Sequence, residues 1–400
     1  MRLHLICLGW LLLPWGDSLL AQETPVVPIT DHRLEIWDAQ KPLPSSAECE
    51  PIDGVQIRLI KAYEPKVDSY DWLHGVALAV HRGRLFASFG HNRGLENTAS
   101  EEARYSTSND VGQTWSPVQT IDVGAEENLA VSHGVFLETK GQLWAFHGAF
   151  YNRLEMVHTR GYLFDDASQR WQQLGEVIGD GFWPMQAPQR IGNQWVMAGL
   201  QIVDGLSRYN DSAAVAICAS DDLTDWQLVV IPKPPEMDLW GESTIFTSAK
   251  SPHRVWNIAR YRQPRALAAF SDDRGRSWST LAETNLSMSA SKPYAGVLPS
   301  GVRYLIGTTT SDSGNRRSPL TIALSAGADD QFSKVMQIRD ARLNPPLAGL
   351  ESGEKIKLSY PYAIVHEEWL LVGYSNDGGR GANRNSAELA LIPIASLGAD

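Results

Sequence analysis

Side chains suited to chemistry stand at the ends of short apolar segments along this chain. Histidine can accept a proton, arginine can hold a carboxylate with two parallel hydrogen bonds, and aromatic rings stack on the apolar face of a sugar. A site that combines these types suits an acidic sugar, because the hydroxyls and the carboxylate take the hydrogen bonds. The candidates are His74, His91, His133, His147, Trp183, Gln186, Glu242, Arg260, Arg262, Lys292, Tyr294, Arg316, Arg317, Tyr360, Tyr362 and Tyr374.

A repeated turn indicates which elements position these residues. The frame Ser-x-Asp-x-Gly-x-Ser/Thr-Trp occurs at residues 108–115 and again at 271–278. Its Asp accepts hydrogen bonds from nearby backbone N–H groups, its Gly allows a positive φ, and its Trp packs beneath the turn. Weaker copies lie at 164–171, 220–226 and 325–332, and the aromatic residue that ends each copy recurs every 52 to 56 residues. This period predicts a structural repeat, with the turns themselves structural.

Each repeat contains four short apolar runs separated by Gly or polar residues, a pattern typical of hairpins and of propeller blades. We therefore predict an all-β fold, a six-bladed β-propeller over residues 70–400, with a seventh blade from residues 33–39 as the alternative. Residues 55–63 would supply the outer strand of the last blade, which closes the ring and leaves no open edge. The inner strands of a propeller converge on one axis, so we expect the candidates to meet at one mouth.

The first residues of the chain predict export. Residues 1–21 resemble a secretory signal, because Arg2 precedes an apolar run that is too short to span a bilayer. Residues 22–69 then form an N-terminal segment that includes the closing strand, and no other stretch predicts a membrane span. We expect a secreted or periplasmic protein. Cys49 and Cys218 remain after removal of the signal, and they form either a disulfide or two free thiols.

Composition narrows the classes of partner. The net charge of −11 argues against nucleic acids and anionic membranes. No phosphate-binding loop, dinucleotide-binding fingerprint or zinc-type Cys/His spacing occurs, so nothing in the sequence demands a cofactor or a metal. With 43% hydrophobic residues, the chain can bury a large core as a single domain. We expect a monomer that acts on an acidic oligosaccharide or polysaccharide.

The repeated turns resemble the Asp-box of the sialidase superfamily, and the resemblance covers essentially the whole chain after the signal. Retaining sialidases use a tyrosine nucleophile, a glutamate that assists it, three arginines that bind the substrate carboxylate, and an aspartate acid/base near the first blade. The segment "SYPYAIVHEEWLLVGYS" resembles the blade that carries the nucleophile, which implies this role for Tyr360. The segment "GESTIFTSAKSPHRVWNIARYR" implies Glu242 as the assisting glutamate and Arg260 or Arg262 as one arginine. A further arginine, implied by "GNRRSPLTIALS", is Arg317 or its neighbour Arg316.

Two places differ from the sialidase pattern. His74 stands where the family has its first arginine, and the loop in "HNRGLENTASEEARYS" offers His91, Glu96, Glu101 and Glu102 in place of the aspartate. A mouth rich in histidine resembles related propellers that cleave polysaccharides next to a uronate, some by elimination and some by release of rhamnose.

Three functions follow from these observations. The first is an exported, exo-acting glycosidase for acidic glycans, in which Tyr360 attacks and Glu242 assists. The second is a polysaccharide lyase or rhamnose-releasing enzyme, in which His74 and His91 act with tyrosine and arginine partners. The third is a non-catalytic propeller that binds a glycan or a protein. A hydrogen bond between Tyr360 and Glu242 would favour the first function, and a cluster of His74 with His91 would favour the second.

Overall fold

The computed structural model describes residues 33–203, 205, 211–327, 329–342 and 350–398. The signal predicted for residues 1–21 lies outside the described residues. The helices among those described are α1 (Pro65–Asp68) and the single 3₁₀ turn η1 (Ile394–Leu397), and none is long and apolar enough to cross a membrane. All other regular elements are strands, which confirms the predicted all-β class.

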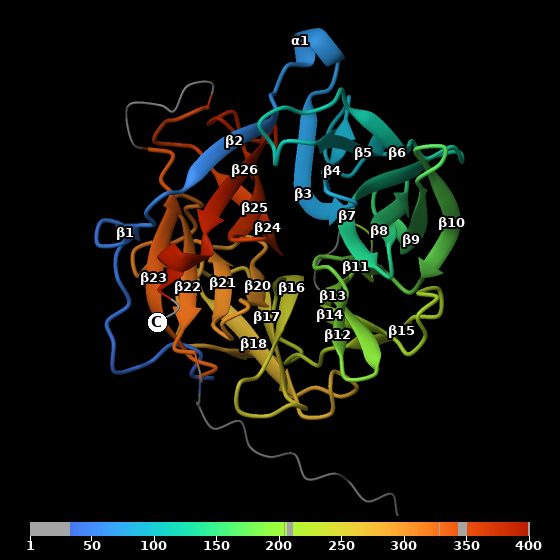
Figure 1. Cartoon of the computed structure of the whole chain (residues 1–400). Helices are drawn as coiled ribbons and strands as arrows, with labels where there is room; N and C mark the ends of the chain where they lie inside the picture. Colours follow the sequence, from blue (N-terminus) through green and yellow to red (C-terminus); the bar gives the residue numbers. More distant parts are fainter. Residues whose placement is uncertain (1–32, 204, 206–210, 328, 343–349, 399–400) are drawn as a thin grey trace, which may run out of the picture. The chain divides into compact units, whose positions relative to one another are not determined.

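Six small sheets stand in a ring, as predicted for a six-bladed propeller, and their strands pair antiparallel except for β1, which pairs parallel with β23 (Figure 1). Blade 1 consists of β3 (Trp72–His81), β4 (Arg84–Asn92), β5 (Glu101–Ser108) and β6 (Gln119–Asp122). Blade 2 consists of β7 (Leu129–Thr139), β8 (Gln142–Tyr151), β9 (Glu155–Asp165) and β10 (Arg170–Ile178). Blade 3 consists of β11 (Phe182–Pro184), β12 (Gln189–Ile191), β13 (Gln194–Gln201), β14 (Ser212–Cys218) and β15 (Gln227–Val230).

The second half of the ring repeats this plan. Blade 4 consists of β16 (Leu239–Thr247), β17 (Val255–Tyr261), β18 (Ala266–Ser271) and β19 (Ala282–Glu283). Blade 5 consists of β20 (Tyr294–Val297), β21 (Arg303–Gly307), β22 (Leu320–Ser325), β23 (Phe332–Arg339) and the short β1 (Glu50–Pro51). Blade 6 consists of β24 (Leu358–His366), β25 (Trp369–Asn376), β26 (Ser386–Pro393) and β2 (Gln56–Lys61).

The N-terminal part of the described chain closes the ring from outside. β2 pairs antiparallel with β26, so the outermost strand of blade 6 comes from the residues that precede blade 1. The residues before β2 add no seventh blade. Leu34 forms an isolated bridge with Thr284 and Trp37 forms one with Phe332, so this segment lies along the outer edges of blades 4 and 5. The seven-bladed alternative is therefore wrong.

The two cysteines do not form a disulfide. Cys49 and Cys218 are both free and buried. Cys49 packs in the apolar cluster of Trp37 and Phe332, whereas Cys218 lies in β14 and belongs to a different cluster.

The two strongest copies of the repeated turn fold identically. Ser108 Oγ donates to Asp110 Oδ1 over 2.7 Å, and Thr114 donates to Asp110 through both its backbone N–H, over 2.8 Å, and its hydroxyl, over 2.7 Å. Ser271, Asp273 and Ser277 make the same three bonds at 2.7, 2.8 and 2.6 Å. These turns join the third and fourth strands of blades 1 and 4, away from the axis, and they are structural.

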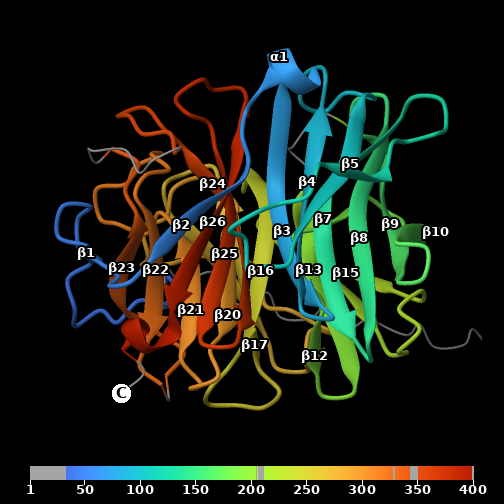
Figure 2. The ribbon, with the colours of Figure 1, turned by 45° about the horizontal axis from the view of Figure 1, so that its top comes forward.

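Regular pairing breaks down in the first half of four inner strands, β3, β7, β16 and β24. The breaks fall between His74 and Ala77, Val131 and Gly134, Leu239 and Ser243, and Ser359 and Tyr362. β-Bulges of this kind bend a strand and re-aim its side chains. Figure 2 shows β3, β16 and β24 running alongside one another through the middle of the ring. The residues inside the breaks are therefore aimed at a common place.

Candidate active site

A cavity of about 560 Å³ opens where these irregular strand ends meet. Blades 1, 4, 5 and 6 contribute to its wall. The lining residues are His74, Glu96, Asn97, Trp240, Glu242, Arg260, Arg262, Arg317, Lys357, Tyr360, Asp377, Gly381, Ala382 and Asn383. The volume lies within the range of small-molecule sites, and its lining combines the residue types expected for an acidic sugar.

A short triangle of hydrogen bonds forms the centre of the cavity. Tyr360 Oη donates to Glu242 Oε1 over 2.5 Å, Arg260 Nη1 donates to the same oxygen over 2.6 Å, and Arg260 Nη1 lies 3.2 Å from Tyr360 Oη. Side chains from blades 4 and 6, separated by 118 residues between Glu242 and Tyr360, thus share one set of atoms. The predicted Tyr360–Glu242 hydrogen bond is present.

The backbone at these positions departs from regular strand geometry. Tyr360 has φ of 55°, in the left-handed region that is uncommon for residues other than glycine. Such strain persists only where surrounding structure holds it, and it clusters at functional sites. Gly75, after His74, has φ of 69°, and a Cβ there would lie 2.3 Å from the ring of His133. Glycine at this position lets the inner strands of blades 1 and 2 approach each other.

The charges of the triangle are set by burial and by one another. Burial, followed by the nearby Glu242 carboxylate, raises the pKa of Tyr360 far above its ordinary value, so the free site holds a neutral phenol. Burial acts to lower the pKa of Arg260, but Glu242 and Tyr360 outweigh it and the net shift is upward. The site therefore presents a fixed cation beside a neutral phenol that donates its hydrogen bond to a carboxylate.

Arg317 provides a second guanidinium beside Tyr360, and Arg262 lies at the rim. Arg317 donates to Ser359 Oγ over 3.1 Å and to the carbonyl of Ala290 over 2.8 Å, which fixes the plane of its side chain. Arg262 instead forms an ion pair with Asp238 at 2.7 Å. Of the arginines that the resemblance left open, Arg260 and Arg317 occupy the inner wall, while Arg316 does not line this cavity.

His74 lies directly against Tyr360, with 3.9 Å between their ring centroids. Ser375 Oγ and Asn385 Nδ2 both lie 3.2 Å from His74 Nδ1, so both can donate to it and leave the proton on Nε2. Burial, followed by the charge of His133, lowers the pKa of His74 well below its ordinary value. His74 thus presents a neutral hydrogen-bond donor beside Tyr360.

Several predicted binding residues form a layer beneath the cavity and do not line it. Lys292 donates to the carbonyl of Pro361 over 2.8 Å, directly after Tyr360, and burial lowers its pKa to about 7. His133 lies 5.7 Å from the Tyr360 ring and 5.0 Å from Trp183, measured between centroids. Tyr294 is buried at 4.8 Å from Tyr362. These residues pack around Tyr360 and do not line the cavity.

Three other candidates point elsewhere. His91 stacks on Tyr70 at 3.8 Å, and burial lowers its pKa to about 3. His147 is buried and donates from Nδ1 to the carbonyl of Ser132 over 2.8 Å. Tyr374 is fully buried and receives a hydrogen bond from Arg339 over 3.0 Å. The cluster of His74 with His91 that would favour the second function does not form at the cavity, because strand β4 turns His91 toward Tyr70.

Of the carboxylates that the sequence offered in place of the aspartate, Glu96 is the one that lines the cavity, whereas Trp240, which also lines it, was not among the candidates. Glu96 is exposed, lies in the loop between β4 and β5, and accepts a hydrogen bond from Asn383 Nδ2 over 2.9 Å. The other two carboxylates, at the start of β5, have different surroundings. Glu102 forms ion pairs with two arginines, and Glu101 is buried beneath the loop, where burial raises its pKa to about 8.

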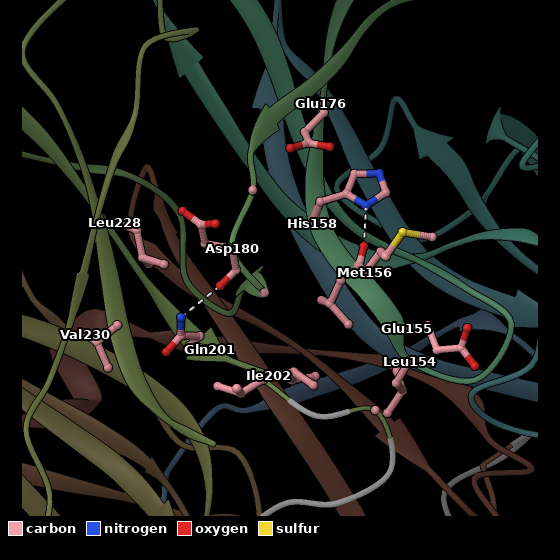
Figure 3. A pocket seen from close by; sticks show the side chains of 15 residues that line it. Leu154, Glu155, Met156, His158, Glu176, Asp180, Gln201, Ile202, Leu228 and Val230 are labelled. Atoms are coloured by element: carbon pink, nitrogen blue, oxygen red, sulfur yellow. Dashed lines mark hydrogen bonds between the residues drawn. The ribbon is translucent and has the colours of Figure 1, made fainter. Parts of the chain in front are cut away.

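A larger cavity, of about 810 Å³, opens between blades 2 and 3 (Figure 3). Glu155, Glu176, Asp180 and His158 are among the residues that line it, and its described lining contains no arginine or lysine. His158 donates from Nδ1 to the carbonyl of Met156 over 2.9 Å, as Figure 3 shows. Without a cation this cavity is poorly suited to an acidic sugar, so size does not identify the active site here.

No group of three or more His, Cys, Asp or Glu side chains among the described residues could hold a metal ion.

Solved structures share the fold at low sequence identity. An uncharacterised protein from Dyadobacter fermentans is 15% identical with a TM-score of 0.62, covering 85% of this chain and 100% of that one. The Hadza microbial sialidase Hz136 is 14% identical with a TM-score of 0.59, covering 82% of this chain and 67% of its own. The NanB sialidase from Streptococcus pneumoniae is 12% identical with a TM-score of 0.59, covering 87% and 71%. At these identities the likeness shows the fold alone.

No curated protein matches the sequence. A family model described as a BNR repeat-like domain matches residues 131–374, which is more than half of the chain. The chain therefore belongs to the BNR repeat-like family, on a six-bladed propeller of the sialidase type.

Proposed function

We propose that this protein is an exported, exo-acting glycoside hydrolase that removes an acidic sugar by a retaining mechanism, with Tyr360 as the nucleophile. The observation that carries the proposal is the 2.5 Å hydrogen bond from Tyr360 Oη to Glu242 Oε1 inside the cationic cavity. A phenol becomes a strong nucleophile when a positioned base takes its proton. A neutral nucleophile also avoids the repulsion that a carboxylate would exert on an anionic sugar.

Each residue has a role that its position supports. Arg260 and Arg317 bind the sugar carboxylate, His74 donates a hydrogen bond beside them, and Glu96 acts on the leaving group from the open side. In the first step Tyr360 Oη bonds to the anomeric carbon, its proton passes to Glu242, and the glycosidic C–O bond breaks as Glu96 protonates the leaving oxygen. In the second step Glu96 takes a proton from water, the water oxygen replaces Tyr360, and Glu242 returns the proton to the phenolate.

The presence of His74 affects which acidic sugar the site prefers. Two guanidiniums and a neutral imidazole hold a carboxylate less firmly than three guanidiniums, because each charged donor contributes more than a neutral one. We propose a uronate or another carboxylate-bearing sugar at the chain end, and not sialic acid as the preferred substrate. Export remains part of the proposal and depends on residues 1–21.

Incubation with a panel of acidic glycans, followed by product analysis, tests this function. Hydrolysis with retained anomeric configuration is expected, together with a covalent adduct on Tyr360 when a fluorinated sugar slows the second step. Products that absorb in the unsaturated-uronate band would instead identify a lyase. A protein that binds these glycans and turns none over would be a binding propeller.

A further inference from the structure

A second cavity, of about 610 Å³, adjoins the proposed catalytic cavity over blades 5 and 6. The two share Arg317, Lys357, Asp377 and Gly381 as lining residues, so they meet along a common wall. We propose that this adjoining cavity is a binding subsite for a second anionic sugar, the unit next to the one that is cleaved. The inference rests on the proposed function and adds to it a polyanionic substrate.

The adjoining cavity is rich in cations. Its lining includes six of them, Arg316, Arg317, Arg342, Lys355, Lys357 and Arg380. Two carboxylates, Glu354 and Asp377, share the lining. This balance contrasts with the net charge of −11 for the whole chain. A local concentration of positive charge beside a catalytic cavity attracts an anionic ligand and orients it.

Three of the arginines are held in place by carboxylates behind them. Arg316 pairs with Asp312 at 3.1 Å, Arg342 pairs with Asp340 at 2.6 Å, and Arg380 pairs with Glu351. A guanidinium has five N–H donors, so one carboxylate leaves donors for a ligand. These pairs therefore hold the arginines in place and leave part of each guanidinium for recognition.

The two lysines of the lining, Lys355 and Lys357, carry positive charges that are not paired with any described carboxylate. In the part of the chain that the structure describes, no carboxylate lies within ion-pairing distance of Lys355 or Lys357, and both are exposed. The carboxylate of Asp377 already accepts the backbone N–H groups of Lys357, over 2.8 Å, and Gly379, over 2.9 Å, so it shapes the turn. The ligand that fits is a sugar bearing a carboxylate or a sulfate, linked to the sugar in the catalytic cavity.

Binding to the Tyr360→Phe protein tests the subsite without turnover. The probes are hexasaccharides of galacturonate, with a carboxylate on every unit, of chondroitin 4-sulfate, with a sulfate on the unit next to each uronate, and neutral maltohexaose, measured by calorimetry at low and high salt. We expect the anionic probes to bind more tightly than maltohexaose and to weaken with salt. Lys355→Glu should weaken them by about three- to tenfold, and Glu354→Gln should strengthen them. Preference between the galacturonate and the chondroitin 4-sulfate probe distinguishes carboxylate from sulfate recognition.

Lys334→Glu is the matched control, because Lys334 is also exposed, lies on β23 of blade 5 and makes the same change in net charge. Equal effects of Lys355→Glu and Lys334→Glu would overturn the subsite, as would binding of the anionic probes no tighter than that of maltohexaose. If the expected binding pattern appears while the unmodified protein hydrolyses no acidic glycan, the subsite stands and the proposed hydrolase function fails.

Discussion

The outer turns and the central cavity place carboxylates in opposite environments. Asp110, in an outer turn, accepts hydrogen bonds from Thr114 and Ser108, and the backbone bond from Thr114 is the main reason that its pKa falls to about 2. Glu101, beneath the loop that borders the cavity, is buried, and its pKa rises to about 8. The turn recurs with the same bonds at Asp273, whereas the cavity joins Glu242 of blade 4 to Tyr360 of blade 6. Repetition thus marks what builds the fold, and chemistry is found where blades differ.

The largest effect should follow from removing the phenol oxygen. Tyr360→Phe leaves a ring of the same shape but no nucleophile, so kcat should fall by about a thousandfold or more, while the thermal midpoint changes little. Steady-state kinetics and a melting curve test this. Tyr362→Phe, one residue beyond Pro361 and also fully buried, is the matched control and should retain activity. Comparable losses in both variants would mean that Tyr360 acts only in packing.

A second, smaller effect should come from the loop carboxylate. Glu96→Gln keeps the size of the side chain but cannot exchange a proton, so kcat should fall by about a hundredfold to ten-thousandfold. The loss should be smaller for substrates with a good leaving group, which needs no protonation, and azide should restore part of the rate. Kinetics with aryl glycosides of graded leaving groups provide the test. An equal loss for every leaving group would contradict an acid/base role.

Stability should depend on pH in two directions. His91, His133 and His147 have pKa values lowered by burial to about 3, 3 and 4, so the unfolded state binds more protons and stability falls as the pH drops below about 6.5. Each such histidine contributes a slope of about 1.4 kcal/mol per pH unit. Glu101 has the opposite sign, because its pKa is raised and its contribution is lost as the pH rises toward 8.

Melting curves between pH 4.5 and 8 should therefore rise up to about pH 6.5 and change little above it, because Lys292, whose pKa is lowered to about 7, offsets Glu101 at higher pH. Glu101→Gln should make the change in stability with pH more positive by about 1.4 kcal/mol per pH unit across this whole range, because the contribution of Glu101 is lost between pH 4.5 and 8. An unchanged pH profile in this variant would show that Glu101 does not titrate as described.

The smallest effect is expected at the outer turn. Asp273→Ala removes the bonds to Ser271 and Ser277, so the thermal midpoint should fall by about 2 to 4 °C with kcat/KM unchanged. The control is Asp272→Ala, which removes only an exposed ion pair with Arg254 and should cost less. A loss of activity at an unchanged thermal midpoint would contradict the claim that the outer turn is only structural and that activity depends on the cavity.

The sequence was informative wherever a local pattern decides the structure. The period of the turns predicted six blades, and the strand ends predicted that Tyr360, Glu242, Arg260, Arg317 and His74 would meet. Prediction succeeded for Arg260 on the second strand of blade 4 but failed for two other side chains on second strands, because alternate residues of a strand face opposite sides. His91 on β4 and Tyr374 on β25 face neighbouring strands and not the axis.

The position of residues on loops was the second feature that the sequence did not predict. Glu96 was visible in the sequence, but whether an exposed loop folds over the axis or away from it depends on distant contacts such as the hydrogen bond from Asn383. The sequence also did not show that Lys292 and His133 lie beneath the cavity and do not line it, because a bulge in a strand shifts which residue reaches the cavity.

The pairing of β2 with β26 has a consequence for biosynthesis. β2 is made early but can pair only after β26 of the last blade has been made. The nascent chain therefore keeps unpaired strand edges until translation is nearly complete. Contacts between distant segments form slowly, and unpaired edges invite aggregation in the interval. Tyr360 lies on β24 of that final blade, so the cavity that it lines together with residues of blades 1, 4 and 5 is complete only when the circle has joined.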